Sequence, residues 1–345
     1  MQQTVLVTGA AGAVGSAVLA KLLARRSKLE VRALDVKTKR SQHILKPYAK
    51  DVEVHWGDLR VPASFEAAVR GVDAVIHLAA IIPPLADHQP ALAEAVNVEG
   101  TRNLIEALQR NAPDAFLLYT SSVSVYGDRV ATPWITVTDP LCPSDGDYYA
   151  VTKIKAEEMV KQSGLKWSVF RLTGIFSPTT SVDPLLFHMP LDTCLEFATT
   201  RDTGRALVYA LDRTAQLIGR TFNLAGGARC RVIYRDFLEQ CFSQVGLGRL
   251  DFPCGAFAER NFHCGYFTDS DELERILHFQ RDSVESYLAW RAQFVPSWQR
   301  RLASGFKAII KQQLLKRSDP YRALKERNSC LIKRFFGETR LKRVA

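Results

Sequence analysis

The sequence predicts an α/β protein built on a doubly wound parallel sheet. Short apolar runs alternate with longer helical patterns through the first half of the chain, an order typical of parallel sheets with helices on both faces. The first run, 5–8, ends in a glycine-rich turn, and an Ala- and Leu-rich helical pattern follows over 13–24. With 345 residues, 47% of them hydrophobic, the chain can bury one large core or two smaller ones.

The glycine-rich turn has the spacing Gly-x-x-Gly-x-x-Gly. Gly9 can supply the backbone angles of the turn, Gly12 lets the main chain approach a pyrophosphate, and Gly15 lets the helix pack closely on the strand. The start of the helix adds free N–H groups and a partial positive charge. The turn is therefore predicted to bind a dinucleotide, and a turn that binds no ligand is the alternative. The expected contacts are Gly9, Ala11, Gly12, Ala13, Val14 and Gly15.

The second predicted strand, 31–35, ends at Asp35, twenty residues after Gly15. An acidic side chain there can accept hydrogen bonds from both ribose hydroxyls of NAD and would repel the 2′-phosphate of NADP. The basic residues that follow within 37–40 would suit that phosphate. The sequence favours NAD over NADP, and the alternative for Asp35 is an ordinary residue at a strand end.

Four further apolar runs predict strands, and two long patterns predict helices. The strands are expected at 52–59, 72–80, 116–122 and 167–171, and the helices at 91–109 and 147–162. The carboxyl ends of parallel strands meet at one edge of a sheet, where ligands bind. The residues at such ends, expected to line one crevice, are Gly9, Asp35, Asp58, Ala79 and Ser122.

Tyr149 and Lys153 lie four residues apart in the predicted helix 147–162, so they share one face. A lysine ammonium and a nicotinamide cation nearby would favour the phenolate and lower the tyrosine pKa from its usual value near 10. Tyr149 could then exchange a proton with a substrate hydroxyl while hydride leaves or joins the carbon. Ser122 could bind the same oxygen, and Lys153 could hold the nicotinamide ribose.

These motifs together resemble the extended short-chain dehydrogenase/reductase family over roughly residues 1–292. In chain order they are Thr8-Gly9-x-x-Gly12-x-x-Gly15, Asp58-Leu59, His77-Leu78-Ala79-Ala80, Asn97-Val98-x-Gly100-Thr101, Ser122-x-x-x-Tyr126-Gly127, Tyr149-x-x-x-Lys153, 222–227 and 266–279. The resemblance implies a Rossmann-type domain and a catalytic set of Ser122, Tyr149 and Lys153, with Asn97 supporting their hydrogen-bond relay. It also implies cofactor contacts from Asp58, Leu59, Leu78, Ala79, Ala80, Asn97, Tyr149 and Lys153.

Two departures from the family pattern bear on the reaction. Nucleotide-sugar dehydratases of this family carry Thr-Asp-Glu where this chain has Ser122-Val123-Ser124, so the acid that expels water is absent and dehydration is disfavoured. The segment 174–202 is short and mostly apolar, with few cations for a diphosphate. The sequence therefore favours a secondary alcohol or ketone of low polarity. A nucleotide-sugar epimerase and a non-catalytic dinucleotide sensor are the alternatives.

The predicted organisation has three parts. Residues 1–173 and 200–224 form the NAD-binding domain, 174–199 and 225–295 form a smaller substrate-binding lobe, and 296–345 form a basic helical tail. Three arginines in the second part of the lobe, at 229, 231 and 235, could still bind a charged substrate. The expected substrate contacts are Ile82, Ser124, Thr173 and Phe176.

The tail carries the whole basic excess of the protein. The net charge is +10, and residues 296–345 hold fourteen Lys or Arg and three Asp or Glu, which leaves −1 for 1–295. Apolar residues recur at helical spacing from Trp298 to Leu314, and Pro320 is expected to end this pattern. The tail is either an amphipathic segment on an anionic membrane surface, through 297–345, or a set of helices that covers the lobe or a subunit partner. Without a recognition motif, nucleic acid is not an expected partner.

The remaining composition indicates a cytoplasmic enzyme that acts on a small molecule. Seven scattered cysteines without C-x-x-C spacing predict reduced thiols, with neither a disulfide framework nor a metal site. No apolar run is long enough for a spanning helix, and the first residues lead directly into a strand, so no leader is expected. Attachment at a membrane surface and a homodimer formed through the two long helices are further expectations.

Overall fold

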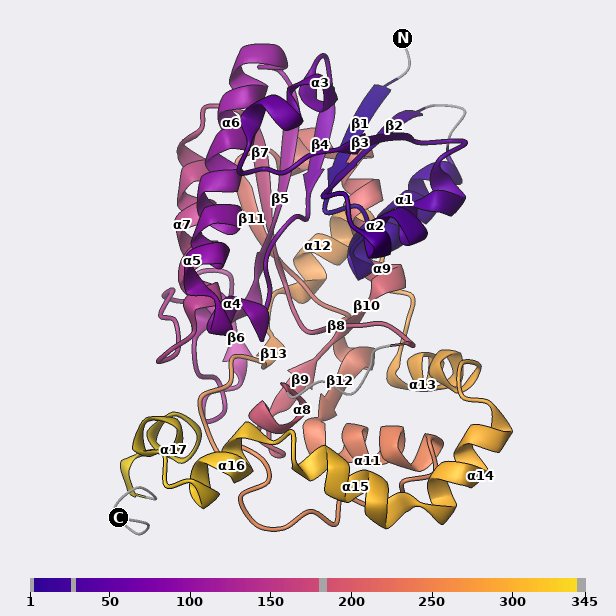
Figure 1. The fold of residues 1–345 in the computed structure, drawn as a ribbon. Helices are drawn as coiled ribbons and strands as arrows, with labels where there is room; N and C mark the ends of the chain where they lie inside the picture. The colour runs from indigo at the N-terminus through magenta and orange to yellow at the C-terminus, as the bar shows by residue number, and fades with distance from the viewer. Residues whose placement is uncertain (1–2, 26–28, 180–184, 340–345) are drawn as a thin grey trace.

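The computed structural model describes residues 3–25, 29–179 and 185–339 (Figure 1). Its centre is a seven-stranded sheet in the order β11-β7-β5-β4-β1-β2-β3, in which every neighbouring pair is parallel. The strands are β1 Gln3–Thr8, β2 Leu29–Asp35, β3 Glu53–Trp56, β4 Ala74–His77, β5 Phe116–Ser122, β7 Lys166–Leu172 and β11 Arg220–Leu224. The predicted doubly wound parallel sheet is confirmed.

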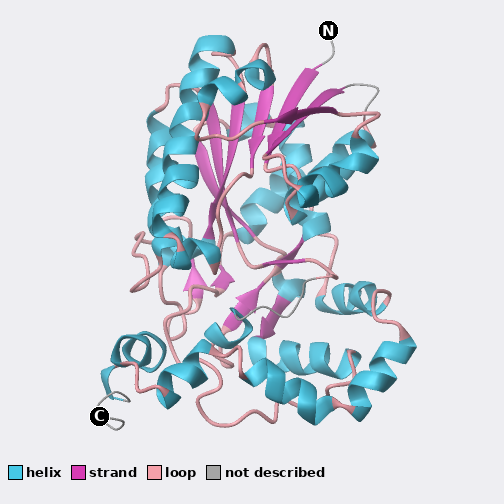
Figure 2. Ribbon diagram, in the orientation of Figure 1, coloured by secondary structure: helices cyan, strands magenta, loops and turns pink. Residues whose placement is uncertain are grey.

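Helices cover both faces of this sheet (Figures 1 and 2). One face carries α1 Ala13–Leu23, α2 Lys39–Leu45, α9 Thr200–Tyr209 and α12 Ser270–Leu277, whose apolar residues share one buried core with the strands. The other face carries α3 Glu66–Val69, α6 Gly100–Asn111 and α7 Tyr148–Gln162 around a second core. The central strands β1, β4 and β5 are buried along almost their whole length because helices cover both of their faces.

The predicted helix 91–109 is one helical segment with an irregular middle. It consists of α5 Pro90–Ala93, a π-helical stretch at Glu94–Glu99 and α6, and it follows the short helix α4 Leu85–His88. π-helical turns often occur at functional sites. This one contains Asn97, which is buried.

A smaller lobe lies beyond the carboxyl ends of the strands (Figure 1). Its strands pair as β8 Ile175–Phe176 with β10 Ala198–Thr199, β9 Cys194–Glu196 with β12 Arg231–Ile233, and β6 Trp134–Ile135 with β13 Tyr266–Phe267. Its helices are α8 Leu185–His188, α11 Tyr234–Gln244 and α13 Val284–Ala292, and the short α10 Thr214–Leu217 precedes β11. Aromatic side chains, among them Phe187, Phe197 and Phe237, dominate its core.

The tail forms four helices along the lobe: α14 Ser297–Gly305, α15 Lys307–Leu315, α16 Asp319–Lys325 and α17 Ser329–Phe336. The prediction that Pro320 ends the helical pattern is wrong, because α15 already ends at Leu315 and Pro320 lies in the first turn of α16. A proline is tolerated there because that turn needs no N–H from it. In the ranges the structure describes, no helix combines the length and apolar character that crossing a bilayer requires.

Candidate active site

The glycine-rich turn brings β1, the start of α1 and the end of β4 into close contact. Gly9 has a positive φ of 66°, and a Cβ on it would lie 2.7 Å from the backbone nitrogen of Ala79. A Cβ on Gly15 would lie 2.4 Å from the carbonyl oxygen of Gly9. Side chains at these two positions would therefore displace the backbone. The first turn of α1 contains no acidic residue, and Gly12 at its N-cap has no side chain that could cap the free N–H groups.

Asp35 joins the end of β2 to this turn. Its carboxylate accepts hydrogen bonds from the backbone N–H of Ala11 at 2.8 Å and of Val36 at 2.8 Å. Burial raises the pKa of Asp35 above its ordinary value, while the hydrogen bonds from Ala11 and Val36 oppose that rise. Asp35 is only partly buried, so its carboxylate lies at the turn with one side open.

Further residues predicted to contact the cofactor lie at the next strand ends. Asp58 follows β3 and is paired with Arg60, whose hydrogen bonds hold the pKa of Asp58 below its ordinary value. Leu59 is buried against Gly100 of α6. After β4, the backbone N–H groups of Leu78 and Ala79 each lie 3.2 Å from the hydroxyl oxygen of Thr8. Ala80 follows and is partly buried.

Ser122, Tyr149 and Lys153 converge where β5 and α7 meet. Ser122 ends β5 and hydrogen-bonds to the Tyr149 hydroxyl. Tyr149 lies in the first turn of α7, which is capped by the Asp147 carboxylate accepting from the N–H of Ala150 at 2.9 Å. The Nζ atom of Lys153 lies 5.9 Å from the centre of the Tyr149 ring. The structure thus brings together the three side chains that the sequence placed in one crevice.

The protein groups in this crevice favour the neutral form of each titrating side chain. Burial raises the pKa of Tyr149 above its ordinary value, and the hydrogen bond from Ser122 only partly opposes this. Burial also lowers the pKa of Lys153 to about 7, despite the nearby charge of Glu157. The predicted lowering of the tyrosine pKa requires a nicotinamide cation beside the lysine, so it stays a prediction, and among the protein groups alone burial dominates.

The side-chain amide of Asn97 joins the loop after β4 to α7. Its Oδ1 accepts from the N–H of Ile81 at 2.7 Å, and its Nδ2 donates to the Ile81 carbonyl and to the Thr152 hydroxyl, each at 3.0 Å. The Thr152 hydroxyl donates in turn to the Tyr149 carbonyl at 2.7 Å. Asn97 therefore ties the π-helical turn to the loop after β4 and to α7. Its part in the relay stays a prediction.

The four expected substrate contacts divide into two groups. Ile82 is 59% exposed on the loop after β4, and Ser124 is buried with its hydroxyl donating to Ser122 at 3.0 Å. Thr173 is buried and its hydroxyl donates to the Glu196 carbonyl at 2.7 Å. Phe176 packs among other aromatic rings of the lobe core, those of Phe197, Phe237 and Tyr287. Thr173 and Phe176 thus make contacts inside the lobe, and their contact with a substrate stays a prediction.

A buried polar network that the motifs did not reveal fixes α7 to the sheet. Arg171 of β7 donates to the two carboxylate oxygens of Glu157 at 2.7 and 3.0 Å and to the Tyr126 hydroxyl at 2.8 Å. That hydroxyl donates to the side chain of Asn223 in β11 at 2.7 Å. Glu157 lies one turn after Lys153 on α7. The network therefore orients the helix that carries Tyr149 and Lys153.

The tail also reaches the edge of the site. Arg334 of α17 pairs with Asp87 after β4 at 3.3 Å, and Asp319 of α16 lies 2.8 Å from Nε2 of His188. A small cavity of about 40 Å³ lies between these contacts and Asp147, the cap of α7. Burial raises the pKa of Asp147 to about 6, against the hydrogen bond from Ala150. No local sequence signal places residue 334 beside residue 87.

The chain belongs to the NAD-dependent epimerase/dehydratase family, since the model of that family matches residues 5–225, more than half of the chain. The resemblance to extended short-chain dehydrogenases/reductases is thereby confirmed. The 3 beta-hydroxysteroid dehydrogenase/Delta 5-->4-isomerase of Mycobacterium tuberculosis is 38% identical over 163 residues, which are 45% of this chain and 41% of that protein. The match thus spans less than half of that relative.

Other relatives match over a longer share of their length. Sanguinarine reductase of Eschscholzia californica is 27% identical over 233 residues, 61% of this chain and 84% of that protein. Among solved structures, UDP-glucuronic acid 4-epimerase from Bacillus cereus, in complex with UDP-glucuronic acid and NAD, has a TM-score of 0.71 at 19% identity. The match covers 85% of this chain and 99% of that one, and it is a likeness of fold.

Proposed function

We propose that the protein is an NAD-dependent oxidoreductase that transfers a hydride to or from a secondary alcohol or ketone of low polarity. The observation that carries the proposal is the convergence of Ser122, Tyr149 and Lys153 at the edge of the sheet. Serine and tyrosine hydroxyls in contact can bind one substrate oxygen and exchange its proton. Family membership and the matched relatives support this reading.

The residues of the turn fit a dinucleotide. The absence of a Cβ at Gly9 and Gly15 lets the turn pack tightly against the end of β4 and the start of α1. The free N–H groups at the start of that helix then lie beside the turn, where a pyrophosphate would bind. The first turn of α1 brings no acidic charge to oppose it. The proposed contacts are Gly9, Ala11, Gly12, Ala13, Val14, Gly15, Asp35, Asp58, Leu59, Leu78, Ala79 and Ala80, with Asn97, Tyr149 and Lys153 nearer the nicotinamide.

Bound NAD would supply the hydride acceptor or donor and, when oxidised, a positive charge. Such a charge opposes the effect of burial on Tyr149 and favours its phenolate. In the oxidative direction, Tyr149 takes the hydroxyl proton of the substrate as the hydride leaves the adjacent carbon. Ser122 donates a hydrogen bond to the same oxygen, and Lys153 holds ribose hydroxyls.

The charge of the lobe favours a substrate of low polarity. The arginines that could bind a diphosphate each have a partner in the protein. Arg231 pairs with Glu196 at 2.7 Å, Arg235 pairs with Asp192 at 3.1 Å, and Arg229 donates to the carbonyl oxygen of Gln280 at 3.0 Å. A nucleotide sugar would have to break these contacts to gain cationic partners.

Epimerisation of a nucleotide sugar is the second candidate. It is supported by the likeness of fold to the Bacillus cereus epimerase, which was solved in complex with UDP-glucuronic acid and NAD. Both reactions would use Ser122, Tyr149 and Lys153. A dehydrogenase changes the nicotinamide absorbance in proportion to product, whereas an epimerase returns the hydride. A non-catalytic dinucleotide sensor would do neither.

We further propose the division into an NAD-binding domain, 1–173 with 200–224, a substrate lobe, 174–199 with 225–295, and the tail 296–345. Homodimerisation through α6 and α7 is a further proposal. It rests on the position of these two helices on the outside of the sheet (Figure 1). Sedimentation equilibrium of the full chain tests it, since a monomer at all concentrations would contradict it.

The tail combines two of the expected roles. Its second half, α16 and α17, packs on the lobe through a small apolar core. Its first half leaves large apolar side chains 52–63% exposed, and these are Trp298, Leu302, Phe306 and Ile309. Apolar side chains in a strongly basic segment suit the surface of an anionic membrane. We therefore assign membrane attachment to α14 and α15.

Replacing Trp298, Leu302 and Phe306 together by serine is expected to abolish sedimentation of the protein with vesicles that contain phosphatidylserine. Insertion of these side chains would supply most of the apolar binding energy, and basic residues alone bind weakly. The control is Ile218→Ser, which changes an exposed apolar residue outside the tail. Membrane attachment is excluded if the unmodified protein stays in the supernatant.

A further inference from the structure

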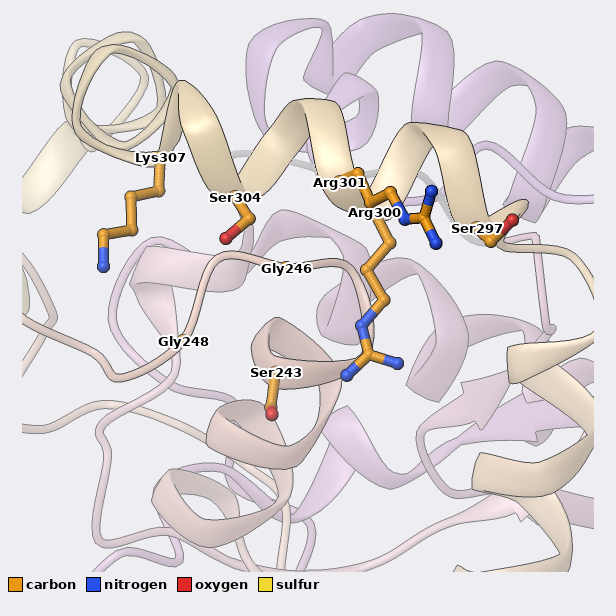
Figure 3. Close-up of a pocket in the computed structure, with 8 residues that line it drawn as sticks. All are labelled: Ser243, Gly246, Gly248, Ser297, Arg300, Arg301, Ser304 and Lys307. Atoms are coloured by element: carbon orange, nitrogen blue, oxygen red, sulfur yellow. The ribbon is translucent and has the colours of Figure 1, made fainter.

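A cavity of about 530 Å³ lies between the end of α11 and α14 (Figure 3). Both helices lie in the part of the lobe away from the seven-stranded sheet (Figure 1). The volume of the cavity is in the range of small-molecule sites, about 300–1,000 Å³. The residues that line it are Ser243, Gly246, Gly248, Ser297, Arg300, Arg301, Ser304 and Lys307. Three cations and three hydroxyls therefore surround one hollow, and its lining contains no carboxylate.

The cationic side chains have little to neutralise them. Over the ranges that the structure describes, Arg300 and Arg301 form no ion pair, and the three serine hydroxyls have no hydrogen-bond partner. Lys307 has one acidic neighbour, Asp251, whose carboxylate is already bound by Lys311. The two guanidinium groups are thus available to an incoming anion.

The backbone holds this arrangement together. The loop after α11 passes so close to α14 that a Cβ on Gly246 would lie 2.3 Å from the carbonyl oxygen of Arg300. In Figure 3 the Arg300 side chain extends from α14 toward Ser243, and Ser304 and Lys307 point to the same side. A guanidinium offers paired donors to a phosphate, and hydroxyls can donate to its remaining oxygens.

We propose that this cavity binds a soluble phosphate ester or pyrophosphate at a site separate from the redox crevice. A lipid headgroup has the same phosphate chemistry but fits the geometry less well. Leu302 lies two positions from both Arg300 and Ser304, and Trp298 lies two positions from Arg300, so at roughly 100° per residue both project from the side of α14 opposite Arg300. A membrane that takes up these apolar side chains would therefore lie away from the cavity.

The test is calorimetric titration of the full-length protein with inorganic pyrophosphate. The double variant Arg300→Ala/Arg301→Ala is expected to weaken the binding about tenfold or more, because each arginine contributes charge-assisted hydrogen bonds. The matched control is Lys316→Ala/Arg317→Ala, which removes the same charge from two adjacent exposed residues of the same tail. It is expected to bind as the unmodified protein does, and thermal unfolding of all three proteins checks their fold.

Three outcomes would overturn the proposal. The first is that the unmodified protein binds no pyrophosphate. The second is that the cavity variant binds it as well as the unmodified protein does. The third is that the control variant loses as much affinity as the cavity variant. A fourth titration uses vesicles that contain phosphatidic acid. If binding to these vesicles depends on Arg300 and Arg301 while pyrophosphate does not bind, the ligand is a lipid headgroup and the proposal is wrong. The titration needs no turnover, so its result is independent of the proposed redox reaction.

Discussion

Tyr149→Phe is expected to lower kcat by about a hundredfold to ten-thousandfold, the range that a positioned proton donor or acceptor contributes. The substitution removes one hydroxyl, the group that hydrogen-bonds to Ser122, and leaves the ring in place. NAD affinity should change little, because the turn and Asp35 are untouched. Initial-rate kinetics and a separate binding titration measure the two effects.

The chain offers a matched control in the adjacent residue. Tyr148 lies beside Tyr149 in the first turn of α7, but its side chain is 52% exposed. Tyr148→Phe should therefore keep nearly full activity. If the two variants have equal activity, Tyr149 is not the acid or base, and the proposed role of Ser122 loses its basis as well.

Arg171→Leu is expected to lower the free energy of unfolding by about 3–5 kcal/mol, the usual effect of leaving one partner of a buried ion pair alone. Both side chains are buried, and Glu157 would lose both of its hydrogen bonds from Arg171. Urea denaturation measures the change. Activity should fall too, because the pair fixes the helix that carries Tyr149 and Lys153.

Two comparisons separate this effect from an ordinary loss of charge. Arg220→Ala, on the neighbouring strand β11, removes a partly exposed ion pair with Glu272 of α12 and should cost about 1 kcal/mol or less. The double variant Arg171→Leu/Glu157→Leu should recover much of the stability, since no unpaired charge remains. If Arg171→Leu costs no more than Arg220→Ala, the pair does not hold α7 in place.

The stability that the ion pair of Arg171 and Glu157 contributes depends on pH. Burial alone would raise the pKa of Glu157, but Arg171, together with Lys161, holds it below the ordinary value of 4.5. A carboxyl group whose pKa is lowered by folding stabilises the protein at pH values above its ordinary pKa. That stabilisation is lost as the pH falls through the lowered pKa. The advantage of the unmodified protein over Arg171→Leu should therefore be full near neutral pH and shrink as acid protonates Glu157, which begins at a higher pH in the variant because Arg171 no longer opposes the effect of burial.

The sequence predicted the sheet well because each strand is a short apolar run with a turn signal at its end. The predicted fourth strand was too long, 72–80 against Ala74–His77, since Leu78 to Ala80 continue the apolar run while their backbone turns toward Thr8. Apolar character alone cannot separate a residue in the ladder from one in the turn. Spacing and order also brought Ser122, Tyr149 and Lys153 together correctly.

Contacts between distant residues, side-chain directions and pKa values could not be predicted from local sequence patterns. The contact between Arg334 and Asp87 joins residues 247 positions apart, and no periodicity reports such a pairing. Thr173 and Phe176 lie next to a strand end, yet their side chains turn into the lobe. The pKa of Tyr149 depends on burial against charge, a balance that residue identities do not give.

The most direct test of hydride transfer uses secondary alcohols deuterated at the carbinol carbon, with sterols, hydroxy-acyl compounds and nucleotide sugars in one panel. The account predicts that at least one apolar alcohol yields its ketone together with an equal amount of reduced nicotinamide that carries the deuterium. A nucleotide sugar converted to its epimer without net reduced nicotinamide would contradict it. So would NAD binding with no conversion of any alcohol in the panel.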